Sequence, residues 1–450
     1  MNHQIFASLR RAKGFRFFCL SPLCVAVAFW AIGCSSTNPS STRAESKDTM
    51  PQTPVAASAP TPKSPEGASQ RILTEADFGK MSYQLAEEGL MACFEKGTHR
   101  TDKVDDHGNP VLAYCEVSAA VALPHTIYFA SDKEIPGDER SSVFSVQRPG
   151  RSKDDNAAPY VDVSSVTHFS QTVYQHLRKA EDFALSQDGQ TVFLTSGFDR
   201  IKTDSTKWHG YNTLMALPAG KPDQAYVVNA HTNPDGSQCS VGLRKALSRA
   251  LANSSFPEGM PYFKVESLVA LPGQTLLFGI REMGQRFDDF SYTITLVEAP
   301  YTKVGGQIRI HEEKMRMVFQ MPKTVLLGHE VALSSLDYDA HTDMLYFLLS
   351  YEEETKNIHL GGFLFRASRT NILSGEPFAP NEATLAHWSD GTLLHFGHKP
   401  EAVTLLHNKM LLVAADDDRV LEQKDPQDAK RSFSKEPHEA AYFILKEKTH

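Results

Sequence analysis

Five polar residues occupy the same position in a pattern that recurs along the chain. They are Ser118, Glu181, Glu266, Ser334 and Glu401, and each begins an apolar run. If these runs converge on one axis, the three glutamates repel one another, and their pKa values rise unless a cation, a basic ligand or bridging water compensates. Calcium, which binds roughly six to eight oxygen ligands, is the candidate metal. Alternatively, each glutamate binds neighbouring backbone amides and ties adjacent repeats together.

A second charged set follows the second β-prone run of each repeat. It comprises Lys133, Arg200, Arg281, Glu282, Asp416, Asp417 and Asp418, with Asp132 and Glu352 beside them. We expect these side chains on loops at the mouth of a central funnel opposite the first set, where they could bind a ligand. Two adjacent pairs, Asp132-Lys133 and Arg281-Glu282, could instead be surface ion pairs of little energetic value. The run 416–418 suggests a metal or a basic partner, or only a solvated charged loop.

The remaining sequence holds none of the common catalytic motifs. A Gly-x-Ser-x-Gly elbow, a Walker loop, a dinucleotide fingerprint and a His-Glu-x-x-His helix are all missing. His395 and His398 fall on an expected strand and loop, so they do not form a preformed metal pair on one helix face. The sequence therefore does not indicate a nucleophilic or nucleotide-driven enzyme.

The elements that position these residues are β-hairpins. An apolar run, a tight turn and a second β-prone run recur at 118–131, 181–196, 266–279, 334–350 and 401–415. Turn residues such as Asp188-Gly189 and Pro272-Gly273 join the runs, which favours antiparallel pairing. The copies start 63 to 85 residues apart, which leaves room for four strands in each. This spacing predicts an all-β fold, a β-propeller of five four-stranded blades. Six is the alternative, if a degenerate blade lies within 223–262.

The outer strands of each blade are less clearly marked. We expect them at 143–146 and 160–163, at 212–217 and 225–229, at 291–297 and 307–310, and at 361–366 and 393–396. The fifth blade has one outer strand at 440–445, and we expect 70–114 to supply the strand that closes the ring. An amphipathic helix at 241–252 should lie outside the sheets. Two segments, 148–159 and 429–438, do not fit the repeat, and either could cap the channel.

The turn Ser186-Gln187-Asp188-Gly189 resembles the Ser-Pro-Asp-Gly turn that joins inner strands in a broad group of bacterial propellers. Glu181, Glu266 and Glu401 look like the Glu of the Glu-Gly-aliphatic motif in phytase-like and esterase-like propellers. Asp182, Ser267 and Ala402 stand where that motif has Gly. The resemblance covers about residues 115–450 and implies the fold rather than an activity.

The N-terminus indicates export. Arg10, Arg11, Lys13 and Arg16 form a basic region, and residues 17–33 are almost entirely apolar. The chain then reads Ala31-Ile32-Gly33-Cys34, which resembles the lipobox of bacterial lipoproteins. That resemblance implies that 1–33 is a cleaved signal peptide and that Cys34 is acylated, for example with palmitate. A plain secretory signal cut near Gly33, or an uncleaved anchor helix, is the alternative.

The segment after Cys34 has the composition of a tether. Residues 34–69 are rich in Ser, Thr, Pro and Ala and have no hydrophobic period, so we place the folded domain at 70–450. Ser35 follows the cysteine where an Asp often signals inner-membrane retention, which implies an outer-membrane lipoprotein facing the periplasm. The formal charge is −8, or −12 once the four basic signal residues are removed. A nucleic-acid partner is therefore not expected.

Three cysteines remain after the signal and the lipidated Cys34 are set aside. Cys93 and Cys115 are 22 residues apart, and export makes a disulfide between them permissible. Cys239 would then be a buried free thiol. No Cys/His spacing typical of zinc is present.

Two functions from different classes follow. The first is a lipid-anchored propeller that serves as a platform for a small ligand or an envelope protein. The second is a metal-dependent hydrolase of phosphate esters or lactones, with the glutamates holding the metal or activating water in the funnel. The sequence itself does not identify the ligand, the substrate or the partner.

Overall fold

The fold is built almost entirely of β-strands. The structure, a computed structural model, describes residues 70–448 apart from 105–107, 136–140, 150–158, 201–205, 355–357, 408 and 426–427. The predicted signal peptide, the predicted lipid site at Cys34 and the tether lie outside the described residues. In the part of the chain that is described, no helix is long and apolar enough to cross a membrane.

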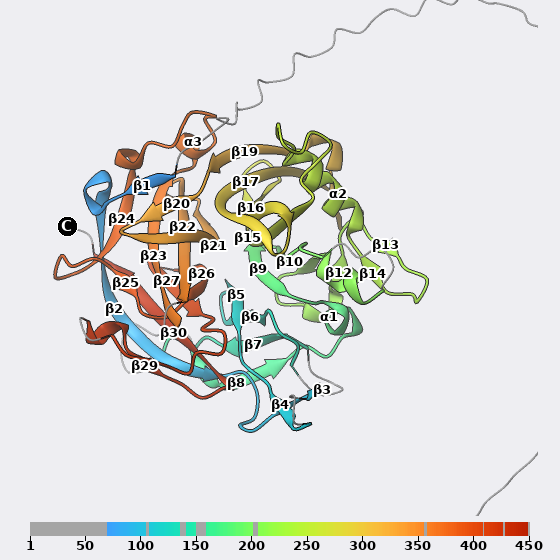
Figure 1. Cartoon of the computed structure of the whole chain (residues 1–450). Helices are drawn as coiled ribbons and strands as arrows, with labels where there is room; N and C mark the ends of the chain where they lie inside the picture. Colours follow the sequence, from blue (N-terminus) through green and yellow to red (C-terminus); the bar gives the residue numbers. More distant parts are fainter. Residues whose placement is uncertain are drawn as a thin grey trace, which may run out of the picture. The chain divides into compact units, whose positions relative to one another are not determined.

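Most of the strands group into antiparallel four-stranded units, which Figure 1 shows arranged one after another. Unit 1 contains β5 (Val117–Ala122), β6 (Thr126–Ser131), β7 (Val143–Gln147) and β8 (Asp162–His168). Unit 2 contains β9 (Ala180–Leu185), β10 (Thr191–Ser196), β11 (Leu214–Pro218) and β12 (Tyr226–Val227). Unit 3 contains β15 (Tyr262–Leu271), β16 (Thr275–Arg286), β17 (Asp289–Val304) and β19 (Arg316–Met321).

The remaining two units share one larger sheet. Unit 4 contains β21 (His329–Asp339), β22 (Met344–Glu354), β23 (Ile358–Ser368) and β24 (Ala383–Trp388). Unit 5 contains β26 (Pro400–Leu406), β27 (Met410–Ala415), β30 (Glu439–Glu447) and β2 (Gly79–Ala92). The two units join where β24 pairs with β2 in parallel.

Each unit begins with the hairpin that the repeat predicted. The turn between β9 and β10 uses Gly189, and the turn between β15 and β16 uses Gly273, both with the positive φ that glycine adopts without steric cost. Asp343 and Lys409 take the same conformation in the corresponding turns of units 4 and 5. The β-branched and aliphatic runs on either side bury almost every residue, as in β10 and β27.

The hydrophobic core is divided among the faces between units. One cluster packs Phe193 of unit 2 against Phe278 of unit 3, and another packs Leu277 of unit 3 against Phe347 of unit 4. Similar clusters join the other neighbouring units. The first strands also contact one another: β5 contacts β9 and β26, β15 contacts β9 and β21, and β21 contacts β26.

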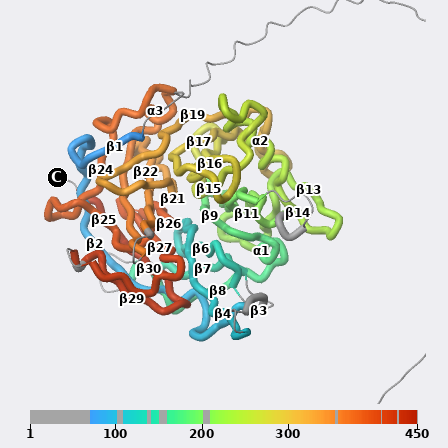
Figure 2. The backbone as a smooth tube through the Cα atoms, viewed as in Figure 1, coloured from blue at the N-terminus to red at the C-terminus, as the bar shows by residue number. Residues whose placement is uncertain are grey.

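The N-terminal part of the described chain completes the last unit. Strand β2 pairs with β30 from Tyr83 to Ala92, and Figure 2 shows the blue N-terminal strand beside the red C-terminal strands. Cys93, directly after β2, is disulfide-bonded to Cys115 with Cα atoms 5.9 Å apart, and Cys239 is a buried free thiol. The fourth strand of unit 5 therefore comes from within 70–114.

Two fourth strands differ from the prediction. In unit 3 the fourth strand is β19, because residues 307–310 form β18 (Gln307–Ile310), which pairs with the overhanging end of β17. In unit 4 it is β24, because β25 (His395–Phe396) pairs with β23 further along, at Gly362 and Phe363. A short strand pairs wherever its partner has free backbone groups, which local sequence does not reveal.

The segments that did not fit the repeat have the following places. The interval 223–262 holds β12, the short hairpin of β13 (His231–Thr232) with β14 (Gln238–Cys239), and α2 (Val241–Ala250); its described residues form no further four-stranded sheet. Most of 148–159 lies outside the described residues. Residues 429–438 hold η6 (Ala429–Arg431) and β29 (Phe433–Ser434), and Lys435 is buried.

Candidate functional site: the central charge cluster

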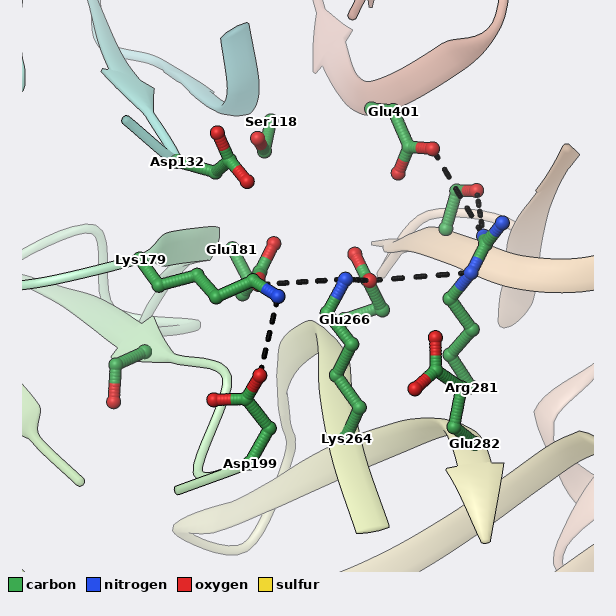
Figure 3. A network of polar contacts seen from close by, with 12 residues as sticks. Ser118, Asp132, Lys179, Glu181, Asp199, Lys264, Glu266, Arg281, Glu282 and Glu401 are labelled. Atoms are coloured by element: carbon green, nitrogen blue, oxygen red, sulfur yellow. Dashed lines mark hydrogen bonds and ion pairs between the residues drawn. The ribbon is translucent and has the colours of Figure 1, made fainter. Parts of the chain in front are cut away.

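All five residues of the first set lie in the first strands of their units and are almost fully buried. Their exposed fractions do not exceed the 4% of Glu401. Figure 3 shows the carboxyl groups of Glu181, Glu266 and Glu401 among basic side chains of the chain itself. Ser118 is turned toward its own strand, where its hydroxyl donates to the Glu116 carbonyl at 3.2 Å.

Lysine and arginine side chains neutralise the glutamates. The Lys264 ammonium contacts the Glu266 carboxylate and lies 3.7 Å from Glu181 Oε1. Lys179 lies at the same distance from Glu181 Oε1, and Lys399 lies 3.4 Å from Glu401 Oε1. The compensating positive charge that the glutamates require is thus supplied, at least in part, by the protein.

Arg281 links three units at this end. Its Nη1 donates to Ser334 Oγ at 2.9 Å and to Ser350 Oγ at 3.0 Å, both in unit 4. Ser350 in turn donates to Glu401 Oε1 of unit 5 at 3.1 Å. The guanidinium also lies 3.9 Å from the carboxylates of Glu266 and Glu401. Arg281 is itself in unit 3, so its buried guanidinium connects the first strands of units 3, 4 and 5.

The second charged set lies at the same end as the first, so the expectation of opposite mouths is wrong. An antiparallel hairpin places the end of its second strand beside the start of its first, as the pairing of Ser267 with Gly279 shows. Arg281 and Glu282 are in strand β16 rather than on a loop. They are not a surface ion pair, because Arg281 is 4% exposed and Glu282 accepts from the Tyr262 hydroxyl at 2.5 Å.

Asp132 and Lys133 do pair, but in a partly buried setting. Lys133 Nζ lies 2.7 Å from Asp132 Oδ2 and 2.5 Å from Glu116 Oε2. Arg200 lies at the edge of the cluster, 2.9 Å from the buried Asp199. The lysine thus bridges two carboxylates, one of which, Glu116, was not among the predicted site residues.

The run 416–418 divides between two environments. Asp416 and Asp418 approach Glu116, and one carboxylate oxygen from each of these three residues lies within 4.8 Å of the others. Asp417 points elsewhere: its Oδ2 lies 2.8 Å from His398 Nδ1 and 3.4 Å from the buried Lys435 ammonium. Lys435 belongs to residues 429–438, the segment considered above as a cap for the channel. This segment thus contributes an ammonium group that neutralises Asp417.

Four cluster members that sequence reasoning missed share one position. Glu116, Lys179, Lys264 and Lys399 each stand two residues before Ser118, Glu181, Glu266 and Glu401. Lys264 lies near the start of β15, and the other three stand directly before β5, β9 and β26, so all four lie at the beginnings of first strands, the same end as the first set. The period-two signal was therefore present in the sequence. Asp199 carries no such signal, because it follows β10 and reaches the cluster only through the fold.

We define the central charge cluster as the following groups. Its carboxylates are those of Glu116, Asp132, Glu181, Asp199, Glu266, Glu282, Glu352, Glu401, Asp416 and Asp418, and its basic groups are those of Lys133, Lys179, Arg200, Lys264, Arg281 and Lys399. The ten carboxylates outnumber the six basic groups by four. Most of these side chains are buried, and outside the set the buried Arg244 also interacts with Asp199, so bound protons or a cation would balance the negative charge that remains.

The pKa values of the cluster move in opposite directions. Burial, reinforced by Asp132, raises the pKa of Glu116 to about 7. Burial and neighbouring carboxylates raise the pKa values of Glu181 and Asp416 well above their ordinary range. Burial alone would also raise the pKa of Asp418, but the charge and hydrogen bond of Lys399 outweigh it and lower that pKa. The cluster therefore holds exchangeable protons next to ionised carboxylates.

Besides Glu116 Oε2, which pairs with Lys133, two carboxylate oxygens of the cluster are buried without a hydrogen-bond partner among the described residues. They are Glu181 Oε1 and Asp199 Oδ1. Gly197 makes room for both, since a Cβ atom there would lie 3.0 Å from the first and 3.6 Å from the second. Oxygen atoms held in this way are suited to receive a cation or a proton donor.

The residues that follow Glu181 and Ser334 add further ties between units, through backbone N–H groups of the neighbouring unit. Asp182 accepts from the backbone N–H of Leu268 in unit 3 at 2.9 Å. Ser335 Oγ accepts from the N–H of Val403 in unit 5 at 3.1 Å. Adjacent residues of a strand face opposite sides, so one residue contacts the cluster and the next bonds to the neighbouring unit.

Comparison with known proteins gives structural likeness without close relationship. No family model matches the chain, and no curated protein matches it. Among solved structures, it is similar to an α-L-arabinanase from Penicillium chrysogenum complexed with arabinobiose (11% identity, 76% of this chain and 82% of that chain, TM-score 0.35). It is also similar to a PQQ-bound aldose sugar dehydrogenase from Streptomyces coelicolor (10% identity, 81% and 99%, TM-score 0.32). Similarity at this level transfers no property of those proteins to this chain.

Proposed function

We propose that the chain is a lipid-anchored binding protein in which a closed five-bladed β-propeller holds a cationic ligand in the central charge cluster. The ring of contacts from β5 through β9, β15, β21 and β26 back to β5 supports the closed propeller. Strand β2 then closes the ring by completing the last blade, and the disulfide beside it fastens that closure.

One observation carries the binding role: the buried cluster has four more carboxylates than basic groups. A charge excess of this kind is costly in a low-dielectric interior, and protonation relieves it only by keeping acids neutral near pH 7. A bound cation relieves it directly. Glu116, Asp416 and Asp418 could hold a divalent metal such as calcium, which prefers carboxylate oxygens. Lys133 and Lys399 already contact two of these carboxylates, so an organic ammonium group is the other form that the cation could take.

Thermal unfolding of the purified protein tests this proposal. We expect calcium or a diamine to raise the melting temperature, because a ligand at 100 times its Kd stabilises the folded state by ~2.7 kcal/mol. Binding should also release protons from groups such as Glu116, which titration calorimetry detects as a heat that depends on the buffer. Asp416→Asn should weaken the shift, whereas Asp188→Asn, in an exposed turn, should not. No shift with metals, diamines or chelator would refute the proposal.

A second candidate is the metal-dependent hydrolase of phosphate esters or lactones. Glu116 and Asp418 lie in the same group of carboxylates and favour this candidate. The raised pKa of Glu116, about 7, suits a proton donor, whereas the lowered pKa of Asp418 keeps that residue ionised. Turnover of aryl phosphates and lactones by the protein would support it, provided that Glu116→Gln abolishes that turnover. If the turnover survives Glu116→Gln, the activity belongs to a contaminant or to another site, and this candidate is refuted.

The membrane anchor is a separate part of the proposal. It depends on the resemblance of residues 31–34 to a lipobox, and it implies a site on the periplasmic side of the outer membrane. Metabolic labelling with a palmitate analogue should mark the protein, and Cys34→Ala should abolish the label and release the protein from the membrane fraction. Labelling that persists in Cys34→Ala would contradict this anchor.

A further inference from the structure

A pocket lies at the outer edge of the molecule, away from the first strands that hold the central charge cluster. Its volume is about 510 Å³, within the range of ~300–1,000 Å³ that small-molecule sites commonly have. We name it the edge pocket. Trp388, Phe396 and Phe443 supply its aromatic surface, and Gln84, Glu88 and Asp390 supply polar groups at its rim.

The pocket arises where two paired strands separate. The parallel pairing of β2 with β24 ends at Tyr83 and Trp388, after which the chain turns away from β2. Strand β2 continues along β30 with a register shift between Leu85 and Glu87. A shift of this kind re-aims the side chains around it, and bulges are frequent beside binding sites. Phe396 and Phe443, with ring centroids 5.6 Å apart, close the bottom of the resulting hollow.

The opposite wall is the segment that contains η6 and β29. Gly397 allows it to pack closely, because a Cβ atom at that position would lie 2.3 Å from Arg431 Cα. The buried Gln423 amide donates to the carbonyls of Gly397 at 2.6 Å and Arg431 at 3.3 Å. These contacts hold the wall in place, so the pocket is a built feature rather than a gap between loops.

The lining indicates the ligand's chemistry. Three aromatic rings suit a flat apolar face, whereas Gln84, Glu88 and Asp390 offer amide and carboxylate groups to several hydroxyls. A purely apolar ligand would strip water from these polar groups without replacing it, and an anion would meet two carboxylates against the single ammonium of Lys430. A sugar ring has both an apolar C–H face and a rim of hydroxyls. We propose that the edge pocket binds a neutral saccharide with one ring stacked on Trp388.

Lys430 is compatible with this role. Its ammonium lies 5.5 Å from the centroid of the Trp388 ring and 3.4 Å from Asp390 Oδ2. Both members of the Lys430–Asp390 pair are more than half exposed, so the pair adds little stability and can separate when a ligand enters. Asp390 would then be free to accept a hydroxyl of the sugar.

The test is a binding titration of the full protein followed by Trp fluorescence and by ligand-observed NMR. The probes are neutral hexoses, N-acetylated hexosamines, their disaccharides, and soluble cell-wall glycan fragments. We expect saturable binding by at least one probe. Preference for the glycan fragments over the free sugars would identify the envelope as the source, and the reverse preference would identify a diffusible sugar.

The variants separate binding from folding. Trp388→Ala should raise Kd at least tenfold, which corresponds to ~1.4 kcal/mol, and Trp388→Phe should recover part of the loss. Gln84→Ala and Glu88→Ala, on the exposed face of β2, should weaken binding without altering the melting temperature. Phe287→Ala removes an aromatic ring that is 65% exposed elsewhere and is the matched control. Absence of saturable binding by every probe, or binding unchanged in Trp388→Ala, would overturn the proposal.

Discussion

Asp182 ties three of the four-stranded units together, and its replacement by alanine should be among the most destabilising single changes in the protein. The carboxylate is fully buried and accepts from the N–H groups of Phe183 and Leu268, both at 2.9 Å, and from the Ser335 hydroxyl at 3.2 Å. The Leu336 N–H is a weaker third backbone donor at 3.5 Å. Alanine would leave these N–H groups without this acceptor, at a cost of ~1–3 kcal/mol for each well-formed bond. We expect the free energy of unfolding to fall by roughly 3–5 kcal/mol, measured by urea denaturation.

Two controls make this prediction specific. Asp182→Asn keeps an amide oxygen for the Leu268 N–H and the Ser335 hydroxyl but turns an NH2 group toward the Phe183 N–H, so it should cost less than Asp182→Ala, about 1–3 kcal/mol. Asp188→Ala removes a carboxylate that accepts from the Gln190 N–H at 3.0 Å in an exposed turn, and it should cost about 1 kcal/mol or less. If Asp182→Ala is no more destabilising than Asp188→Ala, the view that Asp182 couples the units is wrong.

Three further predictions concern charge and cross-linking. Burial raises the pKa of Asp337 from 3.8 to about 6, so its folded form keeps a proton that the unfolded chain loses. The free energy of unfolding should therefore fall by about 3 kcal/mol in total as the pH rises from about 3 to about 7, with about 2 kcal/mol of this between pH 4 and 6. Urea titrations across this pH range should show that Asp337→Asn flattens the fall. Reduction of Cys93–Cys115, which closes a 22-residue separation, should lower the free energy of unfolding by about 3 kcal/mol; equal denaturation midpoints with and without reductant would contradict this. Arg281→Met should lower the free energy of unfolding by ~3–5 kcal/mol, because it leaves buried carboxylates uncompensated. Urea denaturation should show a smaller loss at pH 5 than at pH 8, because protons can replace the charge of the arginine; an equal loss at both pH values would contradict this.

The inner hairpins were predictable because the physics that forms them is local. Alternation of apolar residues and turn residues such as Asp188-Gly189 are properties of short windows, and they gave the first two strands of each unit. The same locality explains the errors in the outer strands. Residues 307–310 form a strand, as predicted, whereas of 393–396 only His395 and Phe396 do. Long-range pairing with overhanging backbone draws both strands out of the fourth position that β19 and β24 occupy.

The charged site divides in the same way. The residues at the starts of the first strands could be located from the sequence, where Lys179, Lys264 and Lys399 also stand two positions before the glutamates. How the charges combine depends on the packing of the units. Arg281 meets Glu401 across 120 residues, and Asp416 and Asp418 meet Glu116 from the other end of the domain. Coulomb interactions and burial depend on distance in space rather than along the chain, so the charge balance of the site exists only once the units pack around it.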